Sequence, residues 1–138
     1  MENIDRVRTV PVITSEILPD KGILICTCNV RGMDGQEFKD AFQEIGQMVR
    51  EHGIKKLIFD KRSLRVFHRD SMEWYHVHWK REMAKYGLRV YRKLLPDDDI
   101  FRMSVDIGKR KILVRHPSFK FADYDIRYCN SIEEAVDT

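Results

Sequence analysis

The segment FHRDSMEWYHVHW, residues 67–79, gathers side chains that could do chemistry: histidines, tryptophans, a tyrosine and an Asp-Ser pair. These residue types allow three interpretations: a metal site, a phosphorylated hydroxyl, or the buried aromatic face of a helix. His76 and His78 are two residues apart, which on a helix places them about 200° apart around the axis. Zinc-binding helices use a spacing of four residues. The pair therefore cannot share a metal, and we predict no metal site and no cofactor.

Patterns typical of enzymes are missing from the sequence. It has no Gly-x-Ser-x-Gly, no phosphate-binding P-loop and no Gly-x-Gly-x-x-Gly. Cys26 and Cys28 would share one face of a strand, but a Cys-x-Cys pair without a second pair is a weak metal signal. The acids at 97–99 are better explained as residues that favour a helix start. We therefore expect a protein that is not an enzyme.

Composition and charge narrow the class further. A chain of 138 residues with 34% charged and 43% hydrophobic residues is typical of a globular protein with a single domain, here residues 1–138. The net charge of +3 is small, and the basic run at 109–111 is short, so we expect no nucleic-acid partner. No apolar run could span a membrane and no signal sequence opens the chain, so we expect a cytoplasmic protein with reduced cysteines.

The first half of the chain predicts a strand hairpin followed by a crossover. Residues 7–17 and 23–30 read as antiparallel strands, with turn residues between them. Asp34 and Glu37 form a capping box at the start of an apolar helix stripe, and Gly53 ends that helix. Residues 55–62 read as a buried strand. A strand, a helix and a strand in this order predict a parallel pair.

The second half predicts a helix over 70–86, with Asp70 as N-cap and Glu73 as its capping-box partner. Its apolar stripe consists of Met72, Tyr75, Trp79, Met83 and Tyr86. A strand follows at 88–95. Residues 98–114 favour a helix, although the alternation of apolar residues also allows a strand. A loop at 116–124, a strand at 126–129 and a short helix after Ser131 complete the chain.

This order of elements resembles the STAS fold of sulfate transporters and anti-sigma factor antagonists. The resemblance covers about residues 20–136 and rests on KLIFD, which ends at Asp60 before a long loop, on the basic strand LRVYRKLLP, and on the closing IRYCNSIEEA. It is greatest for small stand-alone bacterial STAS/Sec14-like proteins. The resemblance implies an α/β fold with a single mixed sheet of about five strands, an N-terminal edge hairpin, and helices mainly on one face.

The same resemblance makes Ser71 a candidate phosphorylation site. In the anti-sigma factor antagonists, a partner kinase phosphorylates a hydroxyl in an Asp-Ser-Ser/Thr-Gly segment at a helix start. Asp70 and Ser71 match the first half of that segment. Met72 and Glu73 replace the second hydroxyl and the glycine, and Glu73 would repel a phosphate.

The aromatic residues of the 70–86 helix cover a wide arc, which indicates a helix buried on two sides. Tryptophan and tyrosine are enriched at the centres of protein interfaces. We therefore predict a regulatory module that acts through protein contacts, as a homodimer and with an unidentified protein partner. The candidate interface residues are Trp74, Tyr75, His78 and Trp79.

An alternative is a carrier or sensor of a small apolar or anionic ligand, either lipid-like or a nucleotide. The Sec14-like proteins that this chain resembles bind lipids, so the resemblance implies a lipid-like ligand. The ligand would occupy a cleft between Trp74, His78 and the loop SLRVFHR, residues 63–69. Guanidinium groups can pair with carboxylate or phosphate, or simply be solvated. The candidate anion-site residues are Arg62, Arg65, His68 and Arg69.

Overall fold

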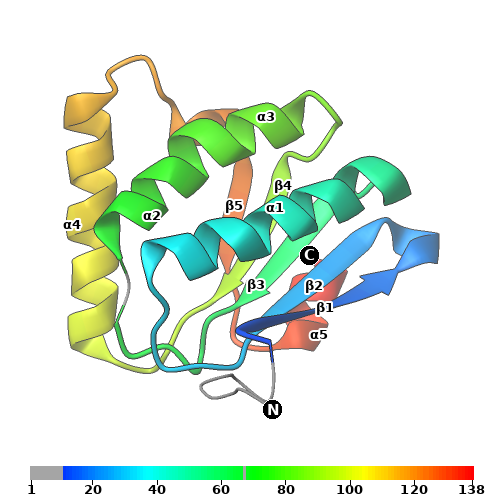
Figure 1. Ribbon diagram of the computed structural model, residues 1–138, viewed down its shortest axis with the longest axis horizontal. Helices are drawn as coiled ribbons and strands as arrows, with labels where there is room; N and C mark the ends of the chain where they lie inside the picture. Colours follow the sequence, from blue (N-terminus) through cyan, green and yellow to red (C-terminus); the bar gives the residue numbers. More distant parts are fainter. Residues whose placement is uncertain (1–10, 67) are drawn as a thin grey trace, which may run out of the picture.

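A computed structural model describes residues 11–66 and 68–138. Its centre is one five-stranded sheet in the order β1-β2-β3-β4-β5 (Figure 1). The strands are β1 (Ile13–Leu18), β2 (Ile23–Cys28), β3 (Lys56–Asp60), β4 (Val90–Leu94) and β5 (Asp125–Tyr128). β1 is antiparallel to β2, and the other neighbours are parallel. This is the mixed sheet with an N-terminal edge hairpin that the sequence predicts.

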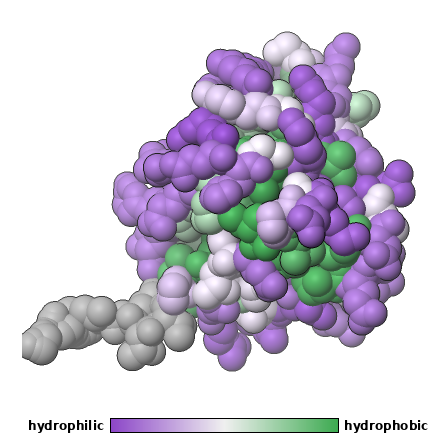
Figure 2. Space-filling model, turned by 90° about the vertical axis from the view of Figure 1, so that its right-hand side faces the viewer, coloured by the Kyte–Doolittle hydropathy of each residue, from purple (hydrophilic) through white to green (hydrophobic). Residues whose placement is uncertain are grey.

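The hairpin closes through a short 3-10 turn at Pro19–Lys21, and Gly22 follows with φ 64°. That left-handed conformation favours glycine. Residues 13–17 of the strand predicted at 7–17 lie in β1, and Pro11 and Val12 precede it. Residues 7–10 lie outside the described residues. Seen from the β1–β2 side, Figure 2 shows apolar surface framed by polar side chains. Exposed Thr14 and Glu16 on β1 make this edge less suited to pairing with another strand.

Helix α1 (Gly35–His52) begins and ends where the sequence predicts. Asp34 accepts a hydrogen bond from the Glu37 backbone, and the Glu37 carboxylate accepts one from the Asp34 backbone. Gly53 ends the helix in the left-handed conformation. The apolar stripe of α1 buries Phe42, Ile45 and Val49 against the sheet.

The predicted helix at 70–86 is helical but differs in two details. It consists of α2 (Arg69–Glu73), a π-helical segment η3 (Trp74–Trp79) and α3 (Lys80–Ala84). Its N-cap is His68 rather than Asp70, because the His68 ring accepts the Ser71 backbone N–H and starts the helix two residues earlier. The π-helical winding is wider than the α-helical one, yet Tyr75, Trp79 and Met83 of the predicted stripe are all buried. Tyr86, the last member of the predicted stripe, is exposed.

The segment that sequence patterns left open is the helix α4 (Asp99–Arg115), with Asp98 as its N-cap. Its buried side chains recur at helical spacing, whereas Met103, which a strand pattern would bury, is exposed. A short helix, α5 (Ile132–Asp137), follows the N-cap Ser131. α5 lies on the opposite face of the sheet from α1 and α2–α3 (Figure 1). No described helix is long and apolar enough to cross a membrane.

α5 is attached to the sheet through the carbonyl groups of its last turn. Lys56 donates hydrogen bonds to the carbonyls of Ala135 and Val136, and the buried Arg92 donates to the carbonyl of Thr138. Arg92 also pairs with Asp125 on β5. Because side chains alternate along β4, Arg92 faces α5 while its neighbours Tyr91 and Lys93 face the other helices.

Candidate functional site

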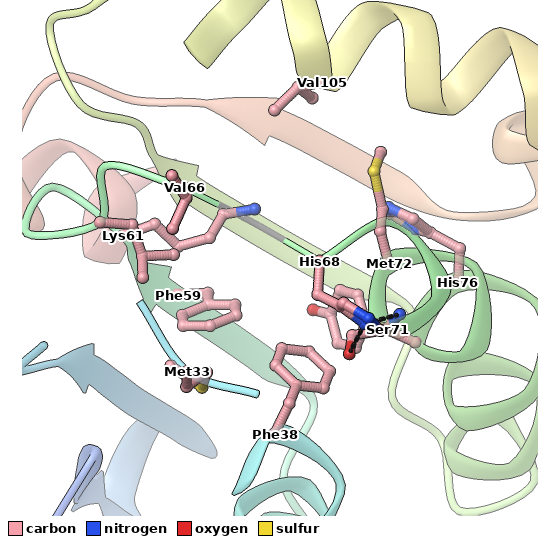
Figure 3. Close-up of a pocket in the computed structure, with 12 residues that line it drawn as sticks. Met33, Phe38, Phe59, Lys61, Val66, His68, Ser71, Met72, His76 and Val105 are labelled. Atoms are coloured by element: carbon pink, nitrogen blue, oxygen red, sulfur yellow. Dashed lines mark hydrogen bonds between the residues drawn. The ribbon is translucent and has the colours of Figure 1, made fainter. Parts of the chain in front are cut away.

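A small cavity of about 50 Å³ lies among the loop after β3, the start of α1 and the start of α2 (Figure 3). Most of its wall is apolar. The apolar and aromatic lining residues are Met33, Phe38, Phe59, Leu64, Val66, Met72, Tyr75 and Val105. Four polar side chains complete the wall: Lys61, His68, Ser71 and His76. We call this space the Ser71 cavity.

Ser71 and His68 form a hydrogen-bonded pair at the start of α2. The distance from Ser71 Oγ to His68 Nδ1 is 2.9 Å, and the Ser71 backbone N–H also points at Nδ1, at 3.3 Å. Because Nδ1 accepts the backbone N–H, it carries no proton, so the Ser71 hydroxyl donates to it. Ser71 is only 4% exposed. Its hydroxyl is therefore held inside the cavity wall rather than at the surface.

Lys61 extends from the end of β3 toward the centre of the cavity (Figure 3). Its amine lies 5.3 Å from the centre of the Phe59 ring. Burial lowers the pKa of Lys61 to about 8, and the positive charge of Lys109 adds to the lowering. At pH 7 this amine is therefore still mostly charged, but it loses its proton more readily than an ordinary lysine.

His76 connects the cavity to a deeper lysine. His76 is 1% exposed, and its Nε2 lies 3.4 Å from the amine of Lys93 on β4. Burial lowers the pKa of both groups well below their ordinary values, and nearby lysines lower them further. His76 Nδ1 has no hydrogen-bond partner among the described residues. His76 is therefore neutral at pH 7, and one of its ring nitrogens is left unsatisfied.

Lys80, one helical turn beyond His76, is completely buried. Its amine lies 4.2 Å from the centre of the Tyr91 ring and 4.9 Å from that of Tyr75, and it has no hydrogen-bond partner among the described residues. Ring contacts stabilise an ammonium by up to about 2 kcal/mol. Removing an ammonium from water costs several kcal/mol. Burial is the larger effect, and it lowers the pKa of Lys80 well below the ordinary value.

The burial of Lys93 could have been predicted from the sequence, although Lys93 belongs to no motif. Arg92 and Lys93 are adjacent on a central strand with helices on both faces, so each must be buried on one side. Lys80 gives a weaker signal, because it lies four residues after His76 and therefore falls on the same side of a helix. No local sequence pattern relates Lys61 to His76, Lys80 or Lys93. Only the fold brings Lys61 close to them.

The structure does not bring the three predicted arginines together around the cavity. Arg62 makes a bidentate pair with Asp60, with distances of 3.0 and 2.8 Å. Arg65 donates to the carbonyls of Arg62 and Leu64. Arg69 is exposed and borders shallow grooves beside α4. Of the four predicted anion-site residues, only His68 lines the Ser71 cavity.

The predicted interface residues divide between the core and the surface. Tyr75 and Trp79 are buried beneath α1, with their rings stacked at 5.5 Å, and the Trp79 indole donates to the Phe42 carbonyl at 2.8 Å. Trp74 is half-buried and His78 is exposed. Trp74 and His78 are therefore the two members of this set that a second molecule can reach.

No group of three or more histidine, cysteine or acidic side chains in residues 11–66 and 68–138 is placed to hold a metal ion. His76 points into the protein and His78 away from it, as their spacing predicts. Cys26 is buried, and burial raises the pKa of its thiol to about 12. It is therefore not a reactive thiolate at neutral pH.

Comparisons with known proteins agree with this architecture. No protein-family model matches the sequence, and no curated protein matches it. Among solved structures, the anti-sigma factor antagonist SpoIIAA in its unphosphorylated form aligns with 91% of this chain and 93% of its own, with a TM-score of 0.60 and 12% identity. The chain therefore has the STAS fold, as the sequence predicts. At this identity the likeness shows the fold alone.

Proposed function

We propose that this chain is a non-enzymatic, cytoplasmic STAS-fold module that senses a small ligand through the Ser71 cavity. The observation that supports this most directly is the cavity wall, in which Lys61, Ser71 and His76 face an otherwise apolar space. A few polar groups on an apolar wall are the usual composition of a ligand site. Lys61 comes from the loop after β3, whereas Ser71 and His76 come from one continuous helical rod, so a ligand would join the loop to the rod.

The size of the cavity favours a sensor over a lipid carrier. A water molecule needs about 10–15 Å³ measured in the same way, so about 50 Å³ holds only a few heavy atoms. Sites for whole drug-sized ligands are several times larger. The cavity is suited to one small group of a ligand, while the remainder would lie outside, past exposed Val66.

A ligand in this cavity would act next to the protein surface. The segment 68–79 carries His68, Ser71 and His76 on the cavity side and Trp74 and His78 on the outer side. SpoIIAA is described as an anti-sigma factor antagonist, which is a role of protein contact. For this chain we propose an analogous regulatory contact, made through Trp74 and His78.

Ser71 phosphorylation is a second candidate, supported by the position of the hydroxyl. A phosphoryl group on Ser71 would enter the cavity that Lys61 and His76 line. Glu73, expected to repel a phosphate, is paired with Arg115 and His116 instead. Because Ser71 is buried, a kinase would reach it only after the neighbouring loop opened.

Native and intact mass spectra of the protein purified from its own cells test both candidates. We expect a retained small molecule in the wild type and much less in Val105→Phe, whose ring would fill the cavity. Val114→Phe is the matched control, because Val114 is exposed on the same helix. An added phosphate on Ser71 would support the second candidate. Repeated spectra of unmodified, ligand-free protein would contradict both.

The predicted homodimer is tested separately, by sedimentation equilibrium at high protein concentration. We expect a dimer mass for the wild type and a monomer mass for Trp74→Asp, because a charge at an interface centre is costly to desolvate. Val114→Asp, on a distant exposed position, should remain dimeric. A wild type that stays strictly monomeric would exclude the homodimer.

A further inference from the structure

Basic side chains from five segments converge at and behind the wall of the Ser71 cavity, with no acidic partner among the described residues. They are Lys61, His76, Lys80, Lys93 and Lys109, which we call the basic cluster. We infer that this cluster makes the inner end of the cavity a binding site for an oxyanion, a phosphate, sulfate or carboxylate group. Lys61 and His76 would bind the anion, and Lys80 and Lys93 would supply positive charge behind them. This inference rests on the proposed function, since it names the group that the ligand inserts.

The hydrogen-bond pattern leaves a donor available to an anion. If the Lys93 amine donates to Nε2 of His76, the ring proton must lie on Nδ1. Nδ1 is the atom of His76 without a partner among the described residues. A buried donor without an acceptor is costly. An oxyanion in the cavity would accept from His76 Nδ1 and from the Lys61 amine at once.

The charges in the interior lack compensation in the free protein. None of the described carboxylates contributes to the pKa values of Lys61, His76, Lys80 or Lys93; their charged neighbours are mostly other lysines. Glu73, the carboxylate three residues before His76 on the same helical rod, pairs with Arg115 and His116 instead. Without a ligand, burial and mutual repulsion favour the neutral forms of these groups. A bound anion would favour the charged, protonated forms, so its binding should take up protons.

Other titratable groups also face the cluster. Burial raises the pKa values of Cys28 on β2, Tyr75 on η3, Tyr91 on β4 and Tyr124 before β5. These groups therefore stay neutral between pH 6 and 8. His68 is a second imidazole at the cavity wall. His68→Asn separates its contribution, because asparagine also serves well as an N-cap.

The test is calorimetric titration of the full chain with inorganic sulfate at constant ionic strength. Sulfate is small enough for the cavity and does not titrate between pH 6 and 8, so protons taken up belong to the protein. We expect saturable binding. As the pH rises by one unit, the affinity should fall about tenfold for each proton that binding takes up. Lys61→Met should bind sulfate at least tenfold more weakly. Lys55→Met, an exposed lysine before β3, is the matched control and should bind like the wild type.

Two further samples distinguish a free anionic ligand from a phosphoryl group attached to Ser71 itself. Ser71→Ala should still bind sulfate if the site takes a free ligand, and protein phosphorylated on Ser71 should not, because its own phosphoryl group fills the site. His68→Asn should retain the pH dependence. Equal sulfate affinity in Lys61→Met and Lys55→Met, or binding independent of pH, would overturn the inference. A retained uncharged ligand in native spectra, with no sulfate binding, would overturn the inference and leave the proposed function standing.

Discussion

Lys80→Met is expected to stabilise the protein at pH 7, by about 1–3 kcal/mol, the usual cost of a buried polar group without a partner. Lys80 is fully buried and its amine has no hydrogen-bond partner among the described residues. Methionine has a similar length and fills the space without a polar atom. Few substitutions of a charged residue should raise stability, so the sign of this effect is diagnostic.

The effect should depend on pH in a defined direction. Burial keeps the pKa of Lys80 in the folded protein well below the ordinary 10.5. Between that lowered pKa and pH 10.5 the unfolded chain therefore binds a proton that the folded chain does not, and the free energy of unfolding of the wild type rises with pH. The rise is up to about 1.4 kcal/mol per pH unit for each such lysine. Lys80→Met loses this contribution, so its advantage should shrink as the pH rises.

Urea denaturation at several values between pH 7 and 9 measures this. At higher pH, Cys26 and the buried tyrosines lose their protons in the unfolded chain before they do so in the folded one. Their ionisation lowers the free energy of unfolding as the pH rises, which opposes the effect of Lys80. Lys85→Met is the matched control, because Lys85 follows the same helix and is exposed beside Glu82. It should change stability by less than about 0.5 kcal/mol. A destabilised Lys80→Met at pH 7 would show that the amine has a partner.

Phe42→Ala is expected to destabilise the protein by about 3–5 kcal/mol, the range for removing a buried phenylalanine ring. Phe42 is completely buried on α1. Its ring lies 4.6 Å from Phe38, 4.9 Å from Tyr75, 5.1 Å from Trp79 and 5.3 Å from Phe59, centre to centre. This ring joins α1 to η3 and to the sheet, so its loss leaves a cavity that three elements border.

Denaturation of Phe42→Ala at pH 7 gives the stability change, and sulfate titration of any folded fraction gives the effect on the site. We expect weaker sulfate binding, because Tyr75 is the residue before His76 and would lose its support. Ile100→Ala, on an exposed position of α4, should change stability by less than about 0.5 kcal/mol. Loss of less than about 1 kcal/mol in Phe42→Ala would contradict the packing described here.

Local sequence signals predicted most of the elements correctly, because their causes are short-range. The capping box at Asp34 and Glu37, the glycine at 53 and the serine at 131 act within one helical turn. The order of elements then determines how they connect, since parallel neighbours require a crossover. The prediction of the N-cap at Asp70 was wrong, because His68, a residue type that is not among the preferred caps, reaches the Ser71 backbone instead.

The candidate site divides in the same way. The sequence by itself placed His68 and Ser71 at a helix start, and it determined that His76 and His78 face opposite sides, because both follow from helical geometry. Only the tertiary structure decided that Lys61, Lys80 and Lys93 meet around His76. Their meeting depends on the side of β4 that Lys93 faces, on the wider turn of η3, and on the path of the loop after β3. These are settled by packing among elements far apart in the sequence, which no local pattern encodes.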